Sequence, residues 1–194
     1  MARKKKDPSE EIVQDNTREA FMAAYCGLTP SRKRTGTDVC DAAGNPFELK
    51  STSSDSVSTA RDVGLHTIAS WRSKYWIVSV GSNFKGGWMT RELYIAHPAD
   101  LEPWFADVEK KLKRDAEAGE TLLRVARAGG VPDELLRRGD YLLKRGLTIN
   151  NPHIPMKLIR ERATSLKPND PQAARKKVKA FIAKRPLGKA PSGQ

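Results

Sequence analysis

The sequence predicts a domain of the α/β (α+β) class, and three features of the chain lead to this prediction. Segments in which apolar residues recur at helical spacing alternate with short runs rich in β-branched and aromatic residues, which are typical of strands. Turn-forming Gly, Asn and Pro residues separate these segments. The 194 residues suffice for one domain with a substantial hydrophobic core.

The charge of the chain indicates a polyanionic partner. The formal net charge is +12, and because no apolar run reaches the length of a membrane span, nucleic acid is favoured over a lipid surface. Cys26 and Cys40 form neither a disulfide framework nor a zinc-binding spacing. No signal peptide opens the sequence, so a cytoplasmic location is expected.

The N-terminal third of the chain predicts an arm, a helix and a loop. Residues 1–9 are rich in Lys and Arg and are expected to be a disordered basic arm. From about Glu10 to Cys26, apolar residues at helical spacing predict a helix. A basic loop that contains Lys33 and Arg34 follows, where it is well placed to meet a phosphate backbone, although a solvated loop fits the same pattern.

The stretch from Asp38 to Lys50 carries the residues with the clearest chemistry. Gly44-Asn45-Pro46 predicts a turn, and Phe47-Glu48-Leu49-Lys50 then alternates with the period of a half-buried strand. Glu48 and Lys50 would therefore project from the same face of that strand. Two carboxylates and one amine are predicted to converge.

These groups suit phosphodiester hydrolysis. Asp38 and Glu48 offer the hard oxygen ligands that Mg²⁺ prefers, and Lys50 offers a cation that can position a water molecule or offset charge on a phosphate. Asp41 is a weaker candidate for this site, because its odd offset from Asp38 turns its side chain to the opposite face of a strand. A solvent-facing hairpin with a cross-strand ion pair would show the same pattern.

The middle of the chain predicts two strands and several helices. A helix and then a strand are expected within His66–Val80, and a further strand within Trp88–Ile95. Pro98 begins an amphipathic helix. Residues 116–147 predict a helical hairpin around a Gly-Gly-Val-Pro break, whose arginines either enlarge a nucleic-acid footprint or form a solvated face.

The C-terminal segment, residues 167–194, is a basic tail with eight Lys or Arg residues and one acidic residue. Asp170 is placed to cap a helix in which Ala174, Val178 and Phe181 share one side. The basic residues favour salt-dependent attraction to phosphates, although a tail without a function has the same composition.

Four separated blocks of the sequence resemble the PvuII-like type II restriction endonucleases of the PD-(D/E)xK nuclease superfamily. The blocks are Gln14-Asp15-Asn16, then Gly27-Leu28-Thr29 with Asp38 to Lys50, then Ser58-Thr59 with Trp76-Ile77, and finally Ile149 to Lys157. The last block is the most specific, because no generic fold demands Asn-Asn-Pro-x-Ile-Pro.

The resemblance implies a restriction-endonuclease-like core with a mixed, mostly antiparallel sheet flanked by helices. Residues 10–166 would form the catalytic and DNA-recognition domain, with 116–147 as an insertion. Asp38 and Glu48, with the main-chain carbonyl of Leu49, would bind one or two Mg²⁺ ions. The resemblance also implies a homodimer that makes Mg²⁺-dependent, blunt double-strand cuts in a short palindromic DNA site.

The resemblance further assigns DNA contacts. Asp15 would approach DNA from the minor groove, and Asn150 and Asn151 would contact adenine, which predicts an A·T pair in each half-site.

One recognition block departs from the family. Ser58-Thr59 is followed by Ala60, Arg61 and Asp62, where the family has histidines that read the central G·C pairs. Because Arg binds guanine O6 and N7 and Asp accepts from cytosine N4, G·C reading by different chemistry is expected, while a surface ion pair between Arg61 and Asp62 is the alternative.

Other functions are consistent with the same residues. A PD-(D/E)xK fold also serves DNA repair or junction cleavage, and a basic DNA-binding protein without catalysis would share the charge. The N-terminal helical region through which the family dimerises is largely missing, so the dimer interface is expected in the insertion or the tail.

Overall fold

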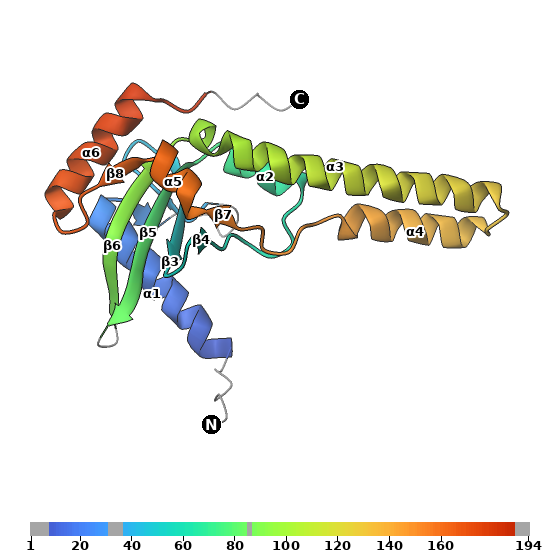
Figure 1. The fold of residues 1–194 in the computed structure, drawn as a ribbon, viewed down its shortest axis with the longest axis horizontal. Coiled ribbons are helices and arrows are strands. Elements are labelled where there is room, and N and C mark those ends of the chain that lie inside the picture. The colour runs from blue at the N-terminus through green and yellow to red at the C-terminus, as the bar shows by residue number, and fades with distance from the viewer. Residues whose placement is uncertain (1–7, 31–36, 85–86, 189–194) are drawn as a thin grey trace.

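The computed structural model describes residues 8–30, 37–84 and 87–188, which form helices on both sides of a central sheet (Figure 1). The helices are α1 (Pro8–Cys26), α2 (Leu65–Trp71), α3 (Pro98–Ala128), α4 (Asp133–Gly146), α5 (Met156–Arg162) and α6 (Pro171–Lys184). The strands are β1 (Thr29–Pro30), β2 (Val39–Cys40), β3 (Pro46–Thr52), β4 (Ser56–Val57), β5 (Tyr75–Phe84), β6 (Gly87–Ala96), β7 (Ile154–Pro155) and β8 (Thr164–Leu166).

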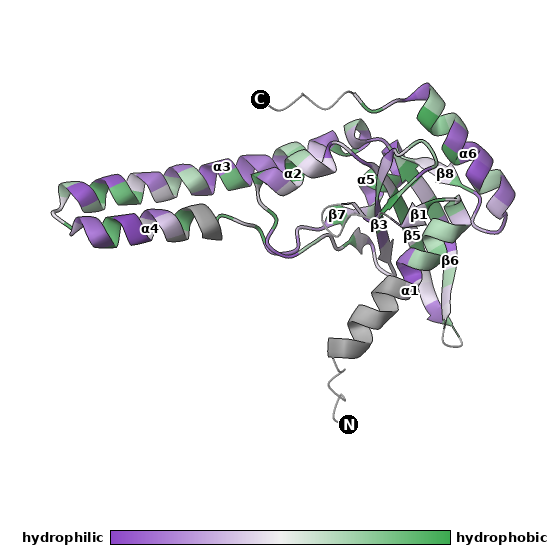
Figure 2. Cartoon of the chain, turned by 180° about the vertical axis from the view of Figure 1, so that it is seen from behind, coloured by the Kyte–Doolittle hydropathy of each residue, from purple (hydrophilic) through white to green (hydrophobic). Residues whose placement is uncertain are grey.

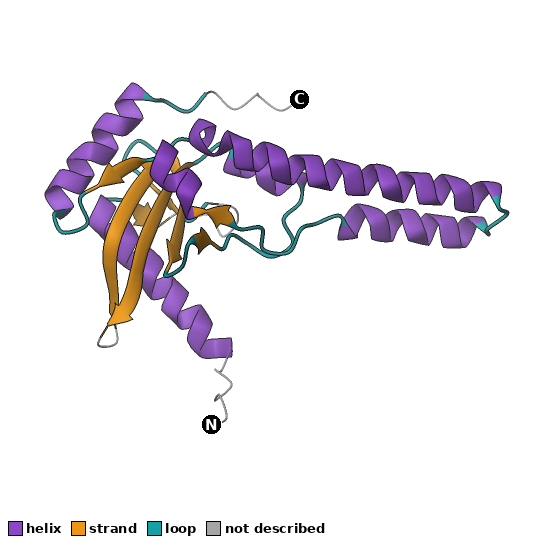
Figure 3. Ribbon diagram, in the orientation of Figure 1, coloured by secondary structure: helices purple, strands orange, loops and turns teal. Residues whose placement is uncertain are grey.

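The central sheet is mixed and mostly antiparallel, which confirms the predicted fold class (Figure 3). Its six strands run in the order β1-β2-β3-β5-β6-β8, and β3 with β5 is the parallel pair. α2 makes the crossover between those two strands, as parallel pairing requires. β4 and β7 form a separate two-stranded ladder.

Two hydrophobic clusters fix the helices to the two faces of the sheet. Side chains along β5 alternate between them: Tyr75 and Ile77 pack with residues of α1 and α6, whereas Trp76 and Val78 pack with residues of α2, α3 and α5. On β3, Phe47 and Leu49 belong to the cluster beneath α1 and α6. Glu48 and Lys50 therefore project from the opposite face, as the sequence predicts.

An aromatic cluster forms the centre of the core on the side of α2 and α3. Trp76 is fully buried, and its ring centroid lies 5.4 Å from that of Trp71 and 6.1 Å from that of Phe105. The indole Nε1 of Trp76 donates a hydrogen bond to the main-chain oxygen of Trp71 at 3.3 Å. Trp76 and Trp71 are therefore both core residues.

A long helical hairpin projects from the domain (Figure 1). α3 continues without a break from the part that packs on the sheet to Ala128, so the first arm of the expected hairpin is not a separate helix. α4 returns alongside it after the Gly-Gly-Val-Pro break. The two helices approach closely at Gly119, where any side chain would overlap Leu143. Hydrophobic and hydrophilic residues alternate along both arms (Figure 2).

The C-terminal helix is part of the core. Ala174, Val178 and Phe181 of α6 are buried against the same face of the sheet as α1. Asp170 caps the helix as predicted, because its Oδ1 accepts a hydrogen bond from Ala173 N at 2.9 Å. At the other end of the chain, α1 begins at Pro8, and residues 1–7 of the predicted basic arm lie outside the described residues.

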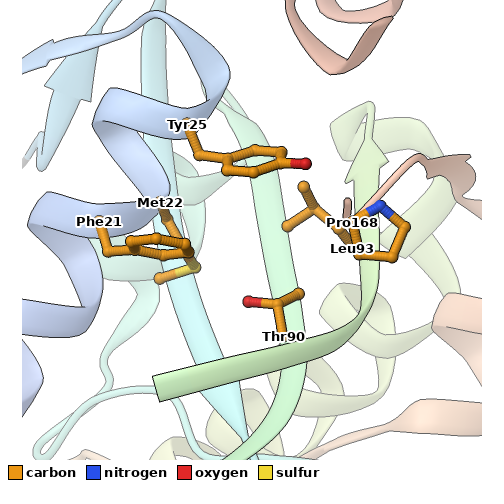
Figure 4. A pocket seen from close by; sticks show the side chains of 6 residues that line it. All are labelled: Phe21, Met22, Tyr25, Thr90, Leu93 and Pro168. Atoms are coloured by element: carbon orange, nitrogen blue, oxygen red, sulfur yellow. The ribbon is translucent and has the colours of Figure 1, made fainter. Parts of the chain in front are cut away.

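A small pocket lies between α1 and β6 (Figure 4). It is lined by Phe21, Met22, Tyr25, Thr90, Leu93 and Pro168. The Tyr25 hydroxyl donates to the main-chain oxygen of Lys167 at 3.0 Å. Because no carboxylate or amine lines it, we interpret the pocket as a gap in side-chain packing.

Within the described part of the chain, no helix is long and apolar enough to cross a membrane.

Candidate active site

A tight turn between β2 and β3 brings Asp38 next to the strand that carries Glu48. Val39 pairs with Phe47 and Cys40 with Pro46 in antiparallel register. Asp41 stabilises the turn, since its Oδ1 accepts hydrogen bonds from Ala43 N and Asn45 N, both at 2.9 Å. Asp41 therefore has a structural role in the turn.

The two carboxylates of the predicted site converge. Asp38 Oδ2 accepts a hydrogen bond from Leu49 N at 2.8 Å, which holds its carboxylate beside β3. Glu48 is only 6% exposed. Burial and the negative charge of Glu48 together raise the pKa of Asp38, although Lys50 opposes this rise. Two acids that share one buried space are a common means of holding a cation.

Two lysines share the carboxylate of Glu48. Lys50 Nζ lies 2.8 Å from Glu48 Oε1, and Lys74 Nζ lies 3.1 Å from Oε2. Burial alone would raise the pKa of Glu48, but the two ammonium groups outweigh burial and lower it. Likewise, burial acts to lower the pKa of Lys50, and the negative charges of Glu48 and Asp38 outweigh it and raise that pKa.

Lys74 is the residue of this site that sequence reasoning missed. It follows α2 and precedes β5, and its 3% exposure is unusual for a lysine. A single lysine between a helix and a strand carries no motif. Parallel pairing of β3 with β5, which sets Glu48 opposite Trp76, brings Lys74 to the carboxylate.

The donor set fits a divalent cation with a preference for oxygen ligands. Asp38 and Glu48 supply two carboxylates. In the described part of the chain, no group of three or more His, Cys, Asp or Glu residues is arranged so that it could hold a metal ion. A Mg²⁺ ion bound by one or two carboxylates completes its shell with water and substrate oxygens, so two acids are enough.

A groove of about 710 Å³ is lined by Lys50, one of the catalytic candidates, and by several of the predicted DNA-contacting residues. Leu49 and Lys50 form part of its lining on β3, and Ser58, Arg61 and Asn151 form part of its lining on other segments. The full lining is Arg18, Glu19, Leu49, Lys50, Ser51, Thr52, Ser53, Ser54, Ser58, Thr59, Ala60, Arg61 and Asn151. Residues about 100 positions apart in the sequence thus share one concave surface.

Hydrogen bonds unite the two predicted recognition segments. Asn151 N donates to Ala60 O at 3.0 Å, and Thr59 N donates to Asn151 Oδ1 at 2.9 Å. Thr59 Oγ1 donates to Pro152 O at 2.6 Å. The β4–β7 ladder continues this pairing, with Val57 opposite Ile154.

The predicted recognition residues differ in their surroundings. Asn150 and Asp62 are exposed outside the groove lining, and Arg61 is exposed within it. Asn151 is half-buried at a φ of +49°, a left-handed conformation that Asn tolerates, and its Oδ1 is engaged by Thr59. Asn151 therefore holds the backbone of the neighbouring segment in place.

Three predicted contacts fall where the structure gives no side-chain description. Lys33 and Arg34 lie outside the described residues. Asp15 lies on α1, but its side chain is also outside the description. Glu19 lies four residues further along α1 and lines the groove, as does Arg18. The i, i+4 spacing from Asp15 to Glu19 is the one sequence signal that could have indicated Glu19.

An α/β domain that places two acids and a lysine on β3 and directly before β2 of a mixed sheet, beside a groove lined by polar residues, has the organisation of a PD-(D/E)xK nuclease. The chain belongs to the restriction endonuclease PvuII family, which matches residues 2–121, more than half of its length. It is a type II restriction endonuclease, a site-specific deoxyribonuclease whose substrate is DNA. The match contains Asp38, Glu48 and Lys50 and ends before Asn150.

Proposed function

We propose that this restriction endonuclease requires Mg²⁺ and, as a homodimer, makes blunt double-strand cuts within a short palindromic DNA site. The observation that carries the proposal is the convergence of Asp38, Glu48 and Lys50 beside a groove that also holds Arg61 and Asn151. Family membership supports DNA cleavage. A two-fold symmetric protein matches a two-fold symmetric site, which favours a palindrome.

Each residue of the catalytic group has a proposed role. Asp38, Glu48 and the main-chain carbonyl of Leu49 would hold the Mg²⁺ ion. When bound, Mg²⁺ lowers the pKa of water and stabilises negative charge on phosphate oxygens. Lys50, held by Glu48 at 2.8 Å, would orient the attacking water and offset charge on the phosphate in the transition state.

The proposed DNA contacts are of two kinds: some position the protein on the phosphate backbone, and others recognise base pairs. Lys33 and Arg34 would contact phosphates, and Ser58 lines the groove, where its hydroxyl would hydrogen-bond to DNA. Asp15 would face the minor groove. The exposed side chains of Arg61 and Asp62 would read a G·C pair, because guanidinium binds guanine O6 and N7 and carboxylate accepts from cytosine N4.

Digestion of a plasmid of known sequence tests the proposed function. The plasmid is incubated with the protein and Mg²⁺, with EDTA as the control, and the fragment ends are sequenced. Discrete fragments with flush ends at one palindromic sequence are expected, and EDTA should leave the plasmid intact. Fragments with scattered ends, or cleavage restricted to branched DNA, would contradict a restriction function in favour of repair or junction cleavage.

The two asparagines are expected to respond differently to substitution. We predict that Asn150→Ala loses about 1–3 kcal/mol of discrimination at one A·T position, because an asparagine amide can pair with adenine N6 and N7. Asn151→Ala instead removes the acceptor of Thr59 N, so cleavage should weaken without a change of preferred base. Cleavage rates on duplexes with single base-pair changes measure both effects.

Asn169→Ala serves as the matched control, since Asn169 is an exposed asparagine before the N-terminus of α6. It should cleave every duplex as the wild type does. If Asn150→Ala kept full discrimination while Asn151→Ala lost it at one position, the two roles would be reversed.

A further inference from the structure

Lys74 occupies an unusual position for a lysine. Its side chain is only 4% exposed, and its Nζ lies 3.1 Å from Oε2 of Glu48, whose side chain is 8% exposed. Lysine is almost never fully buried unless it is paired. The proposed catalytic roles require one ammonium group, that of Lys50, so the second ammonium needs its own explanation.

The charges of the buried cluster balance. In their ionised forms, Asp38 and Glu48 contribute two negative charges, and Lys50 and Lys74 contribute two positive charges. Both oxygens of Glu48 are engaged, Oε1 by Lys50 and Oε2 by Lys74. A buried charge without a partner destabilises a protein strongly, so a balanced set is the stable arrangement when no other cation is bound.

We propose that Lys74 is a built-in counter-ion that competes with the divalent cation for Glu48 and thereby sets the metal affinity of the site. This inference rests on the proposed function, because it takes Asp38 and Glu48 as the metal ligands. A cation that binds Glu48 must share the carboxylate with Lys74 and is repelled by its charge. Lys74 is a positioning residue: its ammonium group holds the Glu48 carboxylate in place until metal binds.

Calorimetric titration of the metal-free protein with Ca²⁺ measures the metal affinity and so tests the proposal independently of cleavage. Ca²⁺ is a suitable probe because it prefers oxygen ligands. Lys74→Met removes the charge and keeps most of the side-chain volume. We expect it to bind Ca²⁺ about tenfold more tightly than the wild type, because one repulsive charge near the site is gone. Lys74→Arg retains the charge and should bind Ca²⁺ as the wild type does.

Two further variants make the test decisive. Lys176→Met removes an exposed lysine of α6, the helix that packs on the face of the sheet opposite to Glu48. It should leave Ca²⁺ affinity unchanged, because an exposed charge is screened by solvent and salt. Lys74→Gln keeps a hydrogen-bond donor without the charge and replaces Lys74→Met if the latter does not fold. Unchanged or weaker Ca²⁺ binding by the folded, uncharged variant would overturn the proposal, since a purely structural lysine gives that result.

Asp38→Asn separates this inference from the proposed function. If Asp38→Asn loses Ca²⁺ binding while the uncharged Lys74 variant shows no gain, the metal site stands and the role of Lys74 is wrong. If Asp38→Asn binds Ca²⁺ as the wild type does, the metal ligands themselves are wrong, and the inference about Lys74 fails with them.

Discussion

Lys50→Ala is expected to reduce DNA cleavage by about 10³-fold or more while DNA binding persists. The ammonium group lies at the edge of the groove, 2.8 Å from Glu48 Oε1, where it can meet both the attacking water and the phosphate. Alanine keeps the strand but removes the cation that offsets the developing charge. Single-turnover cleavage of a plasmid in Mg²⁺ measures the loss, and fluorescence anisotropy of a labelled duplex in EDTA measures binding.

Lys110→Ala is the matched control for this change, because it removes an exposed lysine of α3 that lies outside the basic C-terminal tail. It should cleave DNA at nearly the wild-type rate. Circular dichroism of Lys50→Ala is needed as well, since that change removes one of the two ammonium groups that contact Glu48. A folded Lys50→Ala protein that cleaves within about tenfold of the wild-type rate would exclude the catalytic role of Lys50.

Trp76→Ala is expected to lower the free energy of unfolding by about 3–5 kcal/mol. Trp76 is fully buried on β5, and its ring packs against those of Trp71, Trp104 and Phe105. Alanine would leave a cavity among three rings, and Trp71 O would lose one of its two hydrogen-bond donors, the other being Lys74 N. Urea unfolding followed by circular dichroism measures the change.

Leu122→Ala is the control for this second prediction. Leu122 lies on the projecting part of α3 and is 69% exposed, so its truncation should change stability by no more than about 0.5 kcal/mol. A Trp76→Ala protein that is as stable as Leu122→Ala would contradict the placement of Trp76 at the centre of the core.

Local patterns in the sequence predicted most of the secondary structure. The alternation of Phe47-Glu48-Leu49-Lys50 predicted both the strand and the face from which Glu48 and Lys50 project, because side-chain direction in a strand depends only on position along it. The cap at Asp170 is equally local. The continuity of α3 was not predictable from the pattern, because the buried residues of this helix lie mostly between Pro98 and Leu112, whereas the helix itself continues to Ala128.

The amino-acid sequence by itself determined the kind of chemistry available to this protein, namely two acids, a lysine and a basic chain suited to DNA, because residue types and short-range spacing specify those groups. Only the tertiary structure decided which distant residues meet. It placed Lys74 next to Glu48 through the parallel pairing of β3 with β5, and it joined Thr59 to Asn151 in the lining of the groove. Such contacts depend on strand order and register, which the packing of the whole core selects and no single segment encodes.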